Sequence, residues 1–460
     1  MDFLDDYTIK QRPGSELVAN LGVDVQIFKF DEIRDGVVTE HMLAFGGGKG
    51  WRYNGTGFDE IVTGMTDSPR YGGSGFIGSF VFSNGTDLKV FKWDTSDYAV
   101  SDIADSDAPT ALLWAEFQNR LFGCKDGTEN LYWSDIGAPE AWTNTNFIAL
   151  GAMPLAMKST GEYLFIGTDR GIKKLSSTGD AAIPFKMDDM LNIGVVPNTM
   201  QEISAGILGC WLVNGEYVIF NQYAQSGSDI SVAYGAPVKD VLYSVDLSSD
   251  EIMSFVDSTS GKVIYSMKTE FPIENVSDVF ASVDNNNLQL VLNNTHMGWT
   301  FYNMQIRSMA EYSGDIYFSD YSGGVHKFDK HLYRDNEEDF ISKVITQIYD
   351  EGRSDLEKGY RSLWLSSNSN TKTQIDVSLA LGYQLVENFK ESEIFYAYGG
   401  VWGSSKWGEF IWGGVHKQTS NIELDVYSTA VQFIFEKNYP NADMQITDFT
   451  FTYVPSTQEV

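Results

Sequence analysis

The sequence is poor in cysteine and has no long apolar run. Its 460 residues include two cysteines, Cys124 and Cys210, too few for a secreted scaffold held together by disulfides. Both lie in apolar surroundings, LFGCKD and LGCWLV, so we expect buried free thiols, with a disulfide between them as the less favoured alternative. The longest nearly apolar stretch, residues 205–213, is too short to span a bilayer.

Basic residues are also scarce. Lys and Arg total 32 against 63 Asp and Glu, a formal net charge of −31 at pH 7. Nucleic-acid-binding proteins need clustered Lys and Arg to replace the counterions around phosphates, and no run of three basic residues occurs. We therefore expect neither tight DNA binding nor membrane insertion. The start, MDFLDDYTIK, lacks the basic and apolar regions of a secretory signal, which predicts a soluble protein made in the cytosol.

A hairpin recurs along the first three quarters of the sequence: an apolar run, a Gly/Asn/Asp turn and a second apolar and aromatic run. The clearest copies are residues 42–53 (MLAFGGGKGWRY), 80–93 (FVFSNGTDLKVFKW), 120–133 (RLFGCKDGTENLYW), 163–175 (YLFIGTDRGIKKL), 210–220 (CWLVNGEYVIF) and 315–328 (DIYFSDYSGGVHKF). With Leu43, Val81, Leu121, Leu164 and Trp211 taken as equivalent, the steps are 38, 40, 43 and 47 residues. A strand repeat of this period is typical of β-propeller blades.

The composition favours an all-β fold of this kind. Aromatic residues make up 14% of the sequence, which suits blades that bury each other's faces. Two weaker hairpin candidates, residues 241–255 and 288–302, lie between the last clear copies, so we expect six to eight blades. Residues 1–40 precede the first clear repeat, and the alternating run 23–30 (VDVQIFKF) is expected to be a strand that closes the ring by joining the last blade.

The residue pattern of the sequence changes near residue 340, where the hairpin repeat ends. The charged segment 331–339 (HLYRDNEED) is interpreted as a linker. Beyond it, Ile375, Val377, Leu379 and Leu381 alternate with polar or small residues, which is typical of sandwich strands. The predicted organisation is an N-terminal segment at 1–40, a β-propeller at 41–335 and a C-terminal β-sandwich-like domain at 340–460.

A Gly-rich segment in the second domain, residues 399–414 (GGVWGSSKWGEFIWGG), carries Trp402, Trp407 and Trp412 at spacings of five. Odd spacing in an extended chain sends successive rings to opposite faces, so it does not build a flat sugar-stacking platform. We expect a loop held by buried indoles, with a ligand or partner surface as the alternative.

Four segments together resemble the tail hub or nozzle proteins of short-tailed bacteriophages, including the packaged-DNA stabilisation proteins. They are residues 11–14 (QRPG), 131–142 (LYWSDIGAPEAW), 359–365 (GYRSLWL) and the Trp-Gly string from Trp402 to Gly413. The resemblance marks Trp133 and Trp142, with the three tryptophans of the Gly-rich segment, as structural or interface candidates. The sequence lacks the large insertions of bigger nozzle proteins, which puts its place along the tail axis in doubt.

The resemblance implies a virion protein assembled in the host cytoplasm, without catalytic residues. It implies a ring of identical copies, usually a hexamer, below the portal and adaptor proteins, through which DNA passes and on which tail fibres or spikes dock. The excess of acid leads to the hypothesis that acidic residues line the lumen of the ring, because a basic lumen would grip DNA.

No established catalytic motif points to an enzyme, and no cofactor is expected. Sialidase turns and an arginine cluster are missing, as are HExxH, CxxC pairs, GxSxG and P-loop patterns. Two Asp-rich turns, Asp102-Asp105-Asp107 and Asp126 with Glu129, leave calcium as a weak alternative because carboxylates are its ligands. The alternative function from another class is a monomeric propeller that binds or cleaves glycans.

Overall fold

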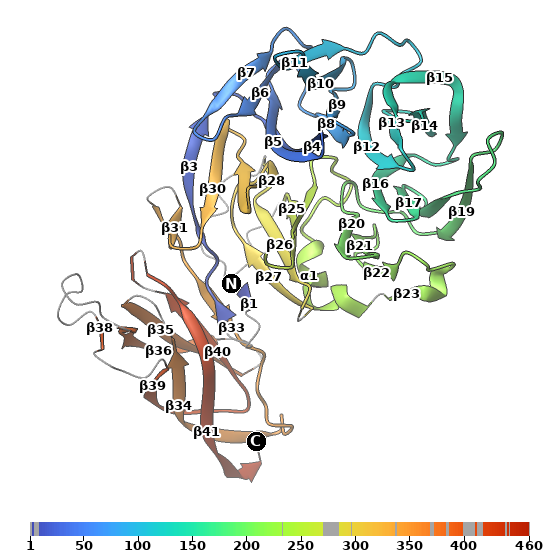
Figure 1. The fold of residues 1–460 in the computed structure, drawn as a ribbon. Coiled ribbons are helices and arrows are strands. Elements are labelled where there is room, and N and C mark those ends of the chain that lie inside the picture. The colour runs from blue at the N-terminus through green and yellow to red at the C-terminus, as the bar shows by residue number, and fades with distance from the viewer. Residues whose placement is uncertain are drawn as a thin grey trace. The chain divides into compact units, whose positions relative to one another are not determined.

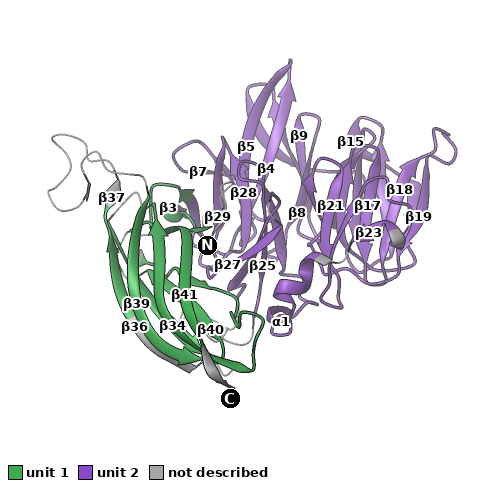
Figure 2. Ribbon diagram, turned by 90° about the horizontal axis from the view of Figure 1, so that it is seen from below, with its two compact units in different colours: residues 1–16, 328–460 green, residues 17–327 purple. Residues whose placement is uncertain are grey.

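The computed structural model forms two compact units (Figures 1 and 2). The larger one, here called the first unit, is residues 17–327 (purple, unit 2 in the key of Figure 2), and the second unit is residues 1–16 with 328–460 (green, unit 1 in that key). The structure describes residues 2–3, 9–231, 233–269, 285–295, 297–335, 338–368, 372–382, 386–398, 410–411, 417–437, 439–440 and 442–459. In this part of the chain no helix is long and apolar enough to cross a membrane.

The first unit is a β-propeller, which confirms the expected fold class. Its described residues form seven blades. Six are antiparallel meanders of four strands, and the seventh is made of the first four strands of a six-stranded sheet. Blade 1 consists of β4 (Gln26–Arg34), β5 (Val37–Gly46), β6 (Lys49–Tyr53) and β7 (Phe58–Val62). Blade 2 consists of β8 (Gly72–Phe76), β9 (Ser79–Ser83), β10 (Leu88–Asp94) and β11 (Asp97–Asp102). Blade 3 consists of β12 (Ala111–Phe117), β13 (Arg120–Lys125), β14 (Asn130–Asp135) and β15 (Ala138–Ala149). Blade 4 consists of β16 (Pro154–Thr160), β17 (Tyr163–Thr168), β18 (Ile172–Ser177) and β19 (Phe185–Leu191). Blade 5 consists of β20 (Gln201–Ser204), β21 (Ile207–Trp211), β22 (Tyr217–Asn221) and β23 (Ile230–Ser231). Blade 6 is β24 (Met253–Asp257), β25 (Lys262–Met267), β26 (Leu288–Asn293) and β27 (Gly298–Tyr302), and blade 7 is β28 (Ser308–Tyr312), β29 (Asp315–Ser319), β30 (Gly324–Asp329) and β3 (Gly14–Asn20).

The repeated hairpin of the sequence is the middle of each blade. Leu43, Val81, Leu121, Leu164 and Trp211 all lie on the second strand of a blade and are 0% exposed. These second strands are sandwiched between neighbouring blades on both faces, so the residues in their middle are apolar, as in Phe80-Val81-Phe82. Outer strands meet water, and β11 and β15 consist of exposed and partly buried residues apart from Trp142.

The ring closes through a strand from the start of the chain. β3 is the outer strand of blade 7, beside β30, and the Leu21 amide donates to the Gly323 carbonyl at 2.8 Å. The alternating run 23–30 was expected to make this closure; instead it leads into β4, the first strand of blade 1. The predicted N-terminal segment 1–40 thus contains both the closing strand and the first blade strand, and the propeller starts well before residue 41.

The meander defines two faces of the propeller. Because each strand reverses the direction of the one before, the turns between second and third strands share one end with the connections between blades. We call this end the connector face; it holds the connection 63–71 and the turn 320–323. The turns between first and second strands, such as Asp35-Gly36 and Ile77-Gly78, lie at the other end, which we call the opposite face.

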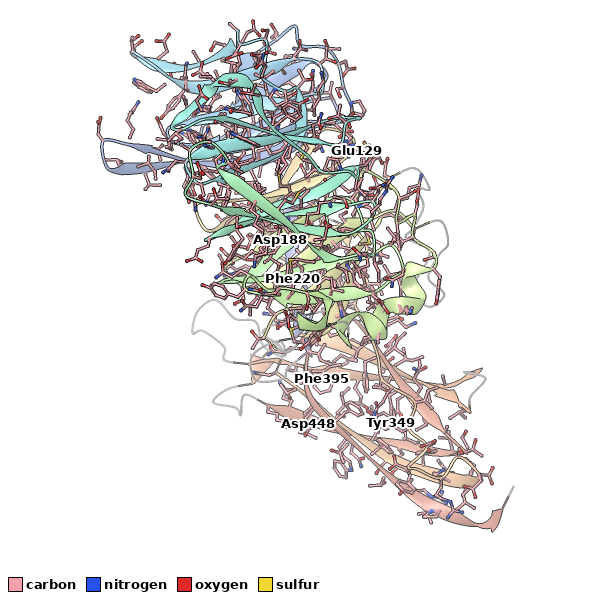
Figure 3. All side chains as sticks on the ribbon, turned by 90° about the vertical axis from the view of Figure 1, so that its right-hand side faces the viewer. Glu129, Asp188, Phe220, Tyr349, Phe395 and Asp448 are labelled. Atoms are coloured by element: carbon pink, nitrogen blue, oxygen red, sulfur yellow. The ribbon has the colours of Figure 1, made fainter. Side chains whose placement is uncertain are left out.

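The second unit is a sandwich of two antiparallel sheets. One sheet has the order β1-β2-β41-β34-β39 and the other β33-β40-β35-β36. Their bounds are β1 (Asp2–Phe3), β2 (Ile9–Lys10), β33 (Lys343–Ile345), β34 (Leu356–Ser367), β35 (Thr373–Leu381), β36 (Val386–Phe395), β39 (Gln418–Ser428), β40 (Val431–Lys437) and β41 (Gln445–Glu459); β37 (Ala397–Tyr398) pairs with β38 (Phe410–Ile411). Leu363, Val377, Ile422 and Phe433, from four different strands, meet in one buried core. Side chains of this unit, such as those of Tyr349 and Phe395, are labelled in Figure 3.

Two further expectations were wrong in detail. Within the segment interpreted as a linker, β31 (Arg334–Asp335) pairs with β32 (Glu338–Asp339). Residues 241–255 are no hairpin. They comprise the end of α1 (Lys239–Leu242), a loop and the start of β24, and α1 itself follows the 3-10 helix η2 (Ala233–Val238). The other weak candidate, residues 288–302, is the β26–β27 hairpin.

Candidate functional site

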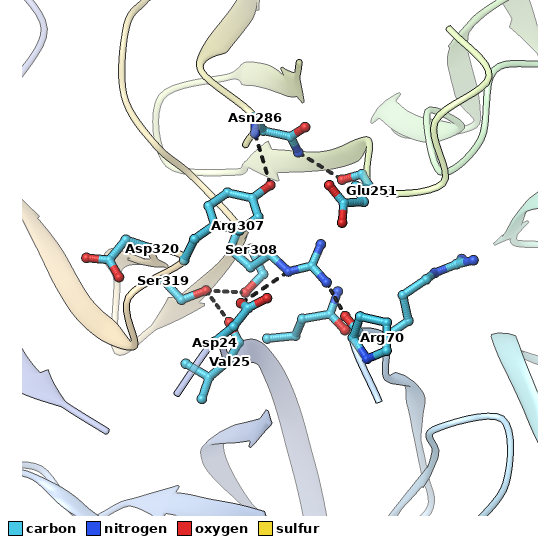
Figure 4. A network of polar contacts seen from close by, with 12 residues as sticks. Asp24, Val25, Arg70, Glu251, Asn286, Arg307, Ser308, Ser319 and Asp320 are labelled. Atoms are coloured by element: carbon cyan, nitrogen blue, oxygen red, sulfur yellow. Dashed lines mark hydrogen bonds and ion pairs between the residues drawn. The ribbon is translucent and has the colours of Figure 1, made fainter. Parts of the chain in front are cut away.

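A buried polar network lies on the connector face where blades 1 and 7 meet (Figure 4). The hydroxyls of Ser308 and Ser319 are 2.7 Å apart. Ser319 donates to the carbonyl of Val25 at 2.7 Å, and Ser308 accepts from the amide of Ile27 at 2.7 Å. Two hydroxyls thus pair the start of β4 with blade 7 at the point where the ring closes.

Arg307, directly before β28, is the largest polar side chain in this network and is 1% exposed. Its Nε lies 3.3 Å from the Asp24 carboxylate, and one of its amino groups donates to the carbonyl of Pro69. The guanidinium lies 5.4 Å from the centre of the Tyr321 ring. A single cation therefore links the connections around blades 1, 2 and 7.

Asp24, the ion-pair partner of Arg307, has a raised pKa. Burial is the main cause, the cation of Arg307 opposes it, and the nearby carboxylates of Glu251 and Asp320 add to the rise. Hydrogen bonds also fix the backbone around the network. The backbone N–H of Asn286 donates to the Tyr321 hydroxyl at 3.1 Å, and the side-chain amide of Asn286 donates to the Glu251 carbonyl at 2.8 Å.

Asp320, in the turn between β29 and β30, behaves differently. Burial alone would raise its pKa, but hydrogen bonds from His326, Ser322 and Gly324 outweigh burial and lower it to about 2. The His326 Nε2 lies 2.9 Å from Oδ2. Asp320 is therefore an ionised cap for its own turn, whereas the ion-pair partner of Arg307 is Asp24.

A second buried polar group lies between blades 1 and 2. The Nε2 of His41 is 3.3 Å from the Glu32 carboxylate, with both side chains at most 2% exposed. The hydroxyl of Tyr98 also donates to Glu32. Burial lowers the pKa of His41 despite this carboxylate, and burial together with the bond to Glu32 raises the pKa of Tyr98 to about 12. His41 and Tyr98 thus give the Glu32 carboxylate hydrogen-bond partners in the otherwise apolar contact between blades 1 and 2.

Two of the candidate tryptophans lie inside the propeller. Trp133 is 7% exposed and packs edge-on against Phe185 with centroids 5.1 Å apart. Trp142 is 5% exposed and donates from Nε1 to the Pro139 carbonyl at 2.9 Å. Both rings fill contacts between blades, so in this chain they have a structural role. Trp402, Trp407 and Trp412 lie outside the described residues.

In the first of the two Asp-rich turns, two carboxylates already have partners in the chain. Asp105 accepts from the Trp142 amide at 2.8 Å, and Asp102 lies 2.6 Å from Lys89. In the described ranges no group of three His, Cys, Asp or Glu side chains is placed to hold a metal ion. Cys124 and Cys210 are free and buried, as expected, and lie on β13 and β21 of different blades.

Arg12, from the QRPG segment of the resemblance, is a structural anchor. It is 4% exposed, forms an ion pair with Asp335, and stacks its guanidinium 3.9 Å from the centre of the Phe340 ring. Ser15 donates to the same carboxylate at 2.8 Å. The charged segment 331–339 therefore contributes a fixed partner to the second unit.

Sequence reasoning did not find these networks. Arg307 was one of several scattered arginines, and nothing near it in sequence indicates a partner at Asp24. The one available signal was the small polar pair Ser319-Asp320 after an apolar strand, which is also an ordinary turn.

Comparisons with known proteins identify no family for this chain. No protein family matches the chain, and no curated protein does. Among solved structures, the WD40 β-propeller domain of Doa1 matches over 69% of this chain and 97% of its own, with 10% identity and a TM-score of 0.42. BamB from Moraxella catarrhalis matches over 70% and 98%, with 10% identity and a TM-score of 0.39. PorZ of Porphyromonas gingivalis, a component of the type-IX secretion system, matches over 67% and 37%, with 11% identity and a TM-score of 0.41.

Proposed function

We propose that this protein is a structural component of a bacteriophage tail, a hub or nozzle ring of identical copies. The ring would sit below the portal and adaptor proteins, with tail fibres or spikes docked outside. The observation that carries the proposal is the ordered resemblance of segments 11–14, 131–142 and 359–365. In the structure Arg12, Trp142 and Leu363, one from each segment, are buried, which suits segments retained for building a framework.

The charge of the chain supports the DNA-conduit part of the proposal. Duplex DNA carries a negative charge about every 1.7 Å along its axis, so a surface with a formal charge of −31 repels it and lets it slide. The seven-bladed body, in which the buried Arg307 pairs with Asp24 across the closing seam, supplies the wall of the conduit in this proposal. Catalysis is not part of this proposal.

Mass spectrometry of purified phage particles tests the function. We expect the chain in the virion in stoichiometric amounts with portal and adaptor proteins. Its absence from particles, together with a monomeric protein that retains oligosaccharides on a glycan array, would replace the proposal by the glycan-binding alternative. Lysine substitutions of acids that line the assembled lumen should slow genome release, and unchanged release would contradict the acidic-conduit part alone.

A further inference from the structure

The first two strands of blade 1 are longer than their counterparts in blade 2. β4 has 9 residues and β5 has 10, whereas β8 and β9 have 5 each. The pairing runs without a break from Gln26↔Phe45 to Arg34↔Val37. Figure 2 shows the hairpin rising beyond the turns of the neighbouring blade on the opposite face. We call residues 31–40 the arm.

The arm has a fixed shape. Its tip is the two-residue turn Asp35-Gly36, with φ of 52° and 76°, and positive values at both positions are those of the tight turn that matches strand twist. On the side of blade 2, Glu32 bonds Tyr98 and the Arg34 guanidinium lies 3.9 Å from the centre of the Trp93 ring. On the side of blade 7, Glu40 accepts from the Ser313 amide at 2.7 Å.

Beyond these anchors the arm presents aliphatic side chains to solvent. Ile33 and Val38 are 61% exposed and lie directly opposite each other in the pairing. Val37 is 63% exposed on the other face. The turn Ile77-Gly78 is next to the arm, since a Cβ at Gly78 would lie 3.8 Å from the Ile33 carbonyl oxygen. Ile77 is 62% exposed and has a φ of 28°, a value that is rare for a β-branched residue. A cluster of exposed aliphatic residues on an ordered element marks a contact surface.

The arm also has unpaired backbone edges. β6 joins β5 only from Leu43 onward, and no described strand pairs with the arm's part of β5 other than β4. β4 is the innermost strand of its blade, so its other edge has no described strand partner either. Free edges flanked by β-branched side chains are templates for adding a strand from another chain.

We propose that the arm binds a second copy of this chain, and this inference rests on the ring assembly proposed above. Copies with a net charge of −31 repel one another, so a contact between them needs a segment without excess charge. The formal charges of residues 33–38, with one arginine and one aspartate, cancel. The three further acids of the arm are compensated within their own chain, because Lys29 pairs with both Asp31 and Glu40 and Glu32 is buried against His41. A stable contact needs roughly 800 Å² on each partner. Six tip residues fall short of that area, so the arm binds along its edge, and each copy of a ring gives one arm and receives another.

Light scattering on the full-length protein after size exclusion tests the arm. We expect the wild type to elute as a multiple of 51.4 kDa. Val38→Glu should raise the dissociation constant roughly tenfold or more, because the contact would bury an unpaired carboxylate. Replacing residues 33–38 by Asn-Gly should abolish assembly. Val38→Thr, which keeps the branched shape, and Ile183→Glu, at a position 65% exposed on another blade, should assemble like the wild type.

The outcomes separate the arm from the ring. If Val38→Glu and the shortened arm both assemble like the wild type with unchanged near-ultraviolet circular dichroism, the arm is not the contact, and the ring proposal stands. A wild type that stays monomeric overturns self-assembly through the arm, while mass spectrometry of particles still decides the tail function. If the monomer floats with phosphatidylcholine vesicles and Val38→Glu does not, the arm binds lipid and the inference is wrong.

Discussion

The hydroxyls of Tyr217 and Tyr265 lie 2.8 Å apart in the core between blades 5 and 6, where both side chains are 0% exposed. Burial raises the pKa of both phenols, so both stay neutral. Trp211 and Trp299 pack around them with ring centroids 5.1 Å apart. Each hydroxyl is the other's partner in a contact that is otherwise apolar and aromatic.

Removing both of these hydroxyls should cost less than the sum of the costs of removing each one alone. Tyr265→Phe leaves the Tyr217 hydroxyl buried, and we expect a loss of about 1–2 kcal/mol in the free energy of unfolding. Tyr217→Phe combined with Tyr265→Phe should lose less than the sum of the single changes, because no unpaired phenol remains. Denaturant unfolding of the propeller measures this, and strictly additive losses would contradict the coupling.

Asp320 should make the propeller sensitive to acid. Its pKa is lowered from 3.8 to about 2 in the folded chain, so its ionised form stabilises the fold above about pH 4 and this contribution is lost as the pH falls toward 2. Asp320→Asn should cost on the order of 2 kcal/mol at pH 6 and much less at pH 2.5. Asp315→Asn, which removes a surface partner of Lys327, serves as the control and should change little at either pH.

Arg307→Met should destabilise the seam between blades 1 and 7 by about 3 kcal/mol at pH 7, because it leaves the Asp24 carboxylate half-buried without its cation. The pKa of Asp24, already raised, should rise further. Since protonation then relieves the penalty, the difference from wild type should shrink as the pH falls through that pKa. Thermal unfolding between pH 4 and 7 measures this, and a difference that stays constant would show that Asp24 carries no charge in the fold. Arg170→Met, on an exposed turn, is the control.

Neither cysteine should react in the folded protein. Burial raises the pKa of Cys124 to about 12 and that of Cys210 further, so almost no thiolate exists at pH 8. Ellman's reagent should label no thiol in the native state and two after denaturation. Labelling of Cys210 without loss of the fold would mean that blade 5 opens locally.

The sequence predicted the middle of each blade better than its margins. Second strands are buried on both faces, so runs such as 80–83 are almost wholly apolar and recur visibly. First strands and outer strands carry mixed patterns: β8 (GGSGF) has three glycines in five residues, because a Cβ at Gly72 would lie 2.0 Å from the Leu112 carbonyl oxygen. Such a segment has no strand-like periodicity and is recognisable only from its neighbours in space.

The ring closure and the polar networks were beyond sequence reasoning for a different reason. Gly14–Asn20 (GSELVAN) is no more strand-like than other segments, and its partner β30 lies some three hundred residues away. Arg307 and Asp24 are equally distant in sequence. Pairings of this kind depend on the circular order of the blades, which a periodic pattern implies only in outline.

Closure by β3 affects the order in which the propeller can be completed. The ribosome makes residues 14–20 first, yet their strand partner, Gly324–Asp329, emerges only after all the other blades. Contacts so remote in sequence carry a high entropic cost and form late. The nascent propeller therefore remains an open arc with an exposed apolar margin until its last blade is translated, and this interval is when it most needs a chaperone.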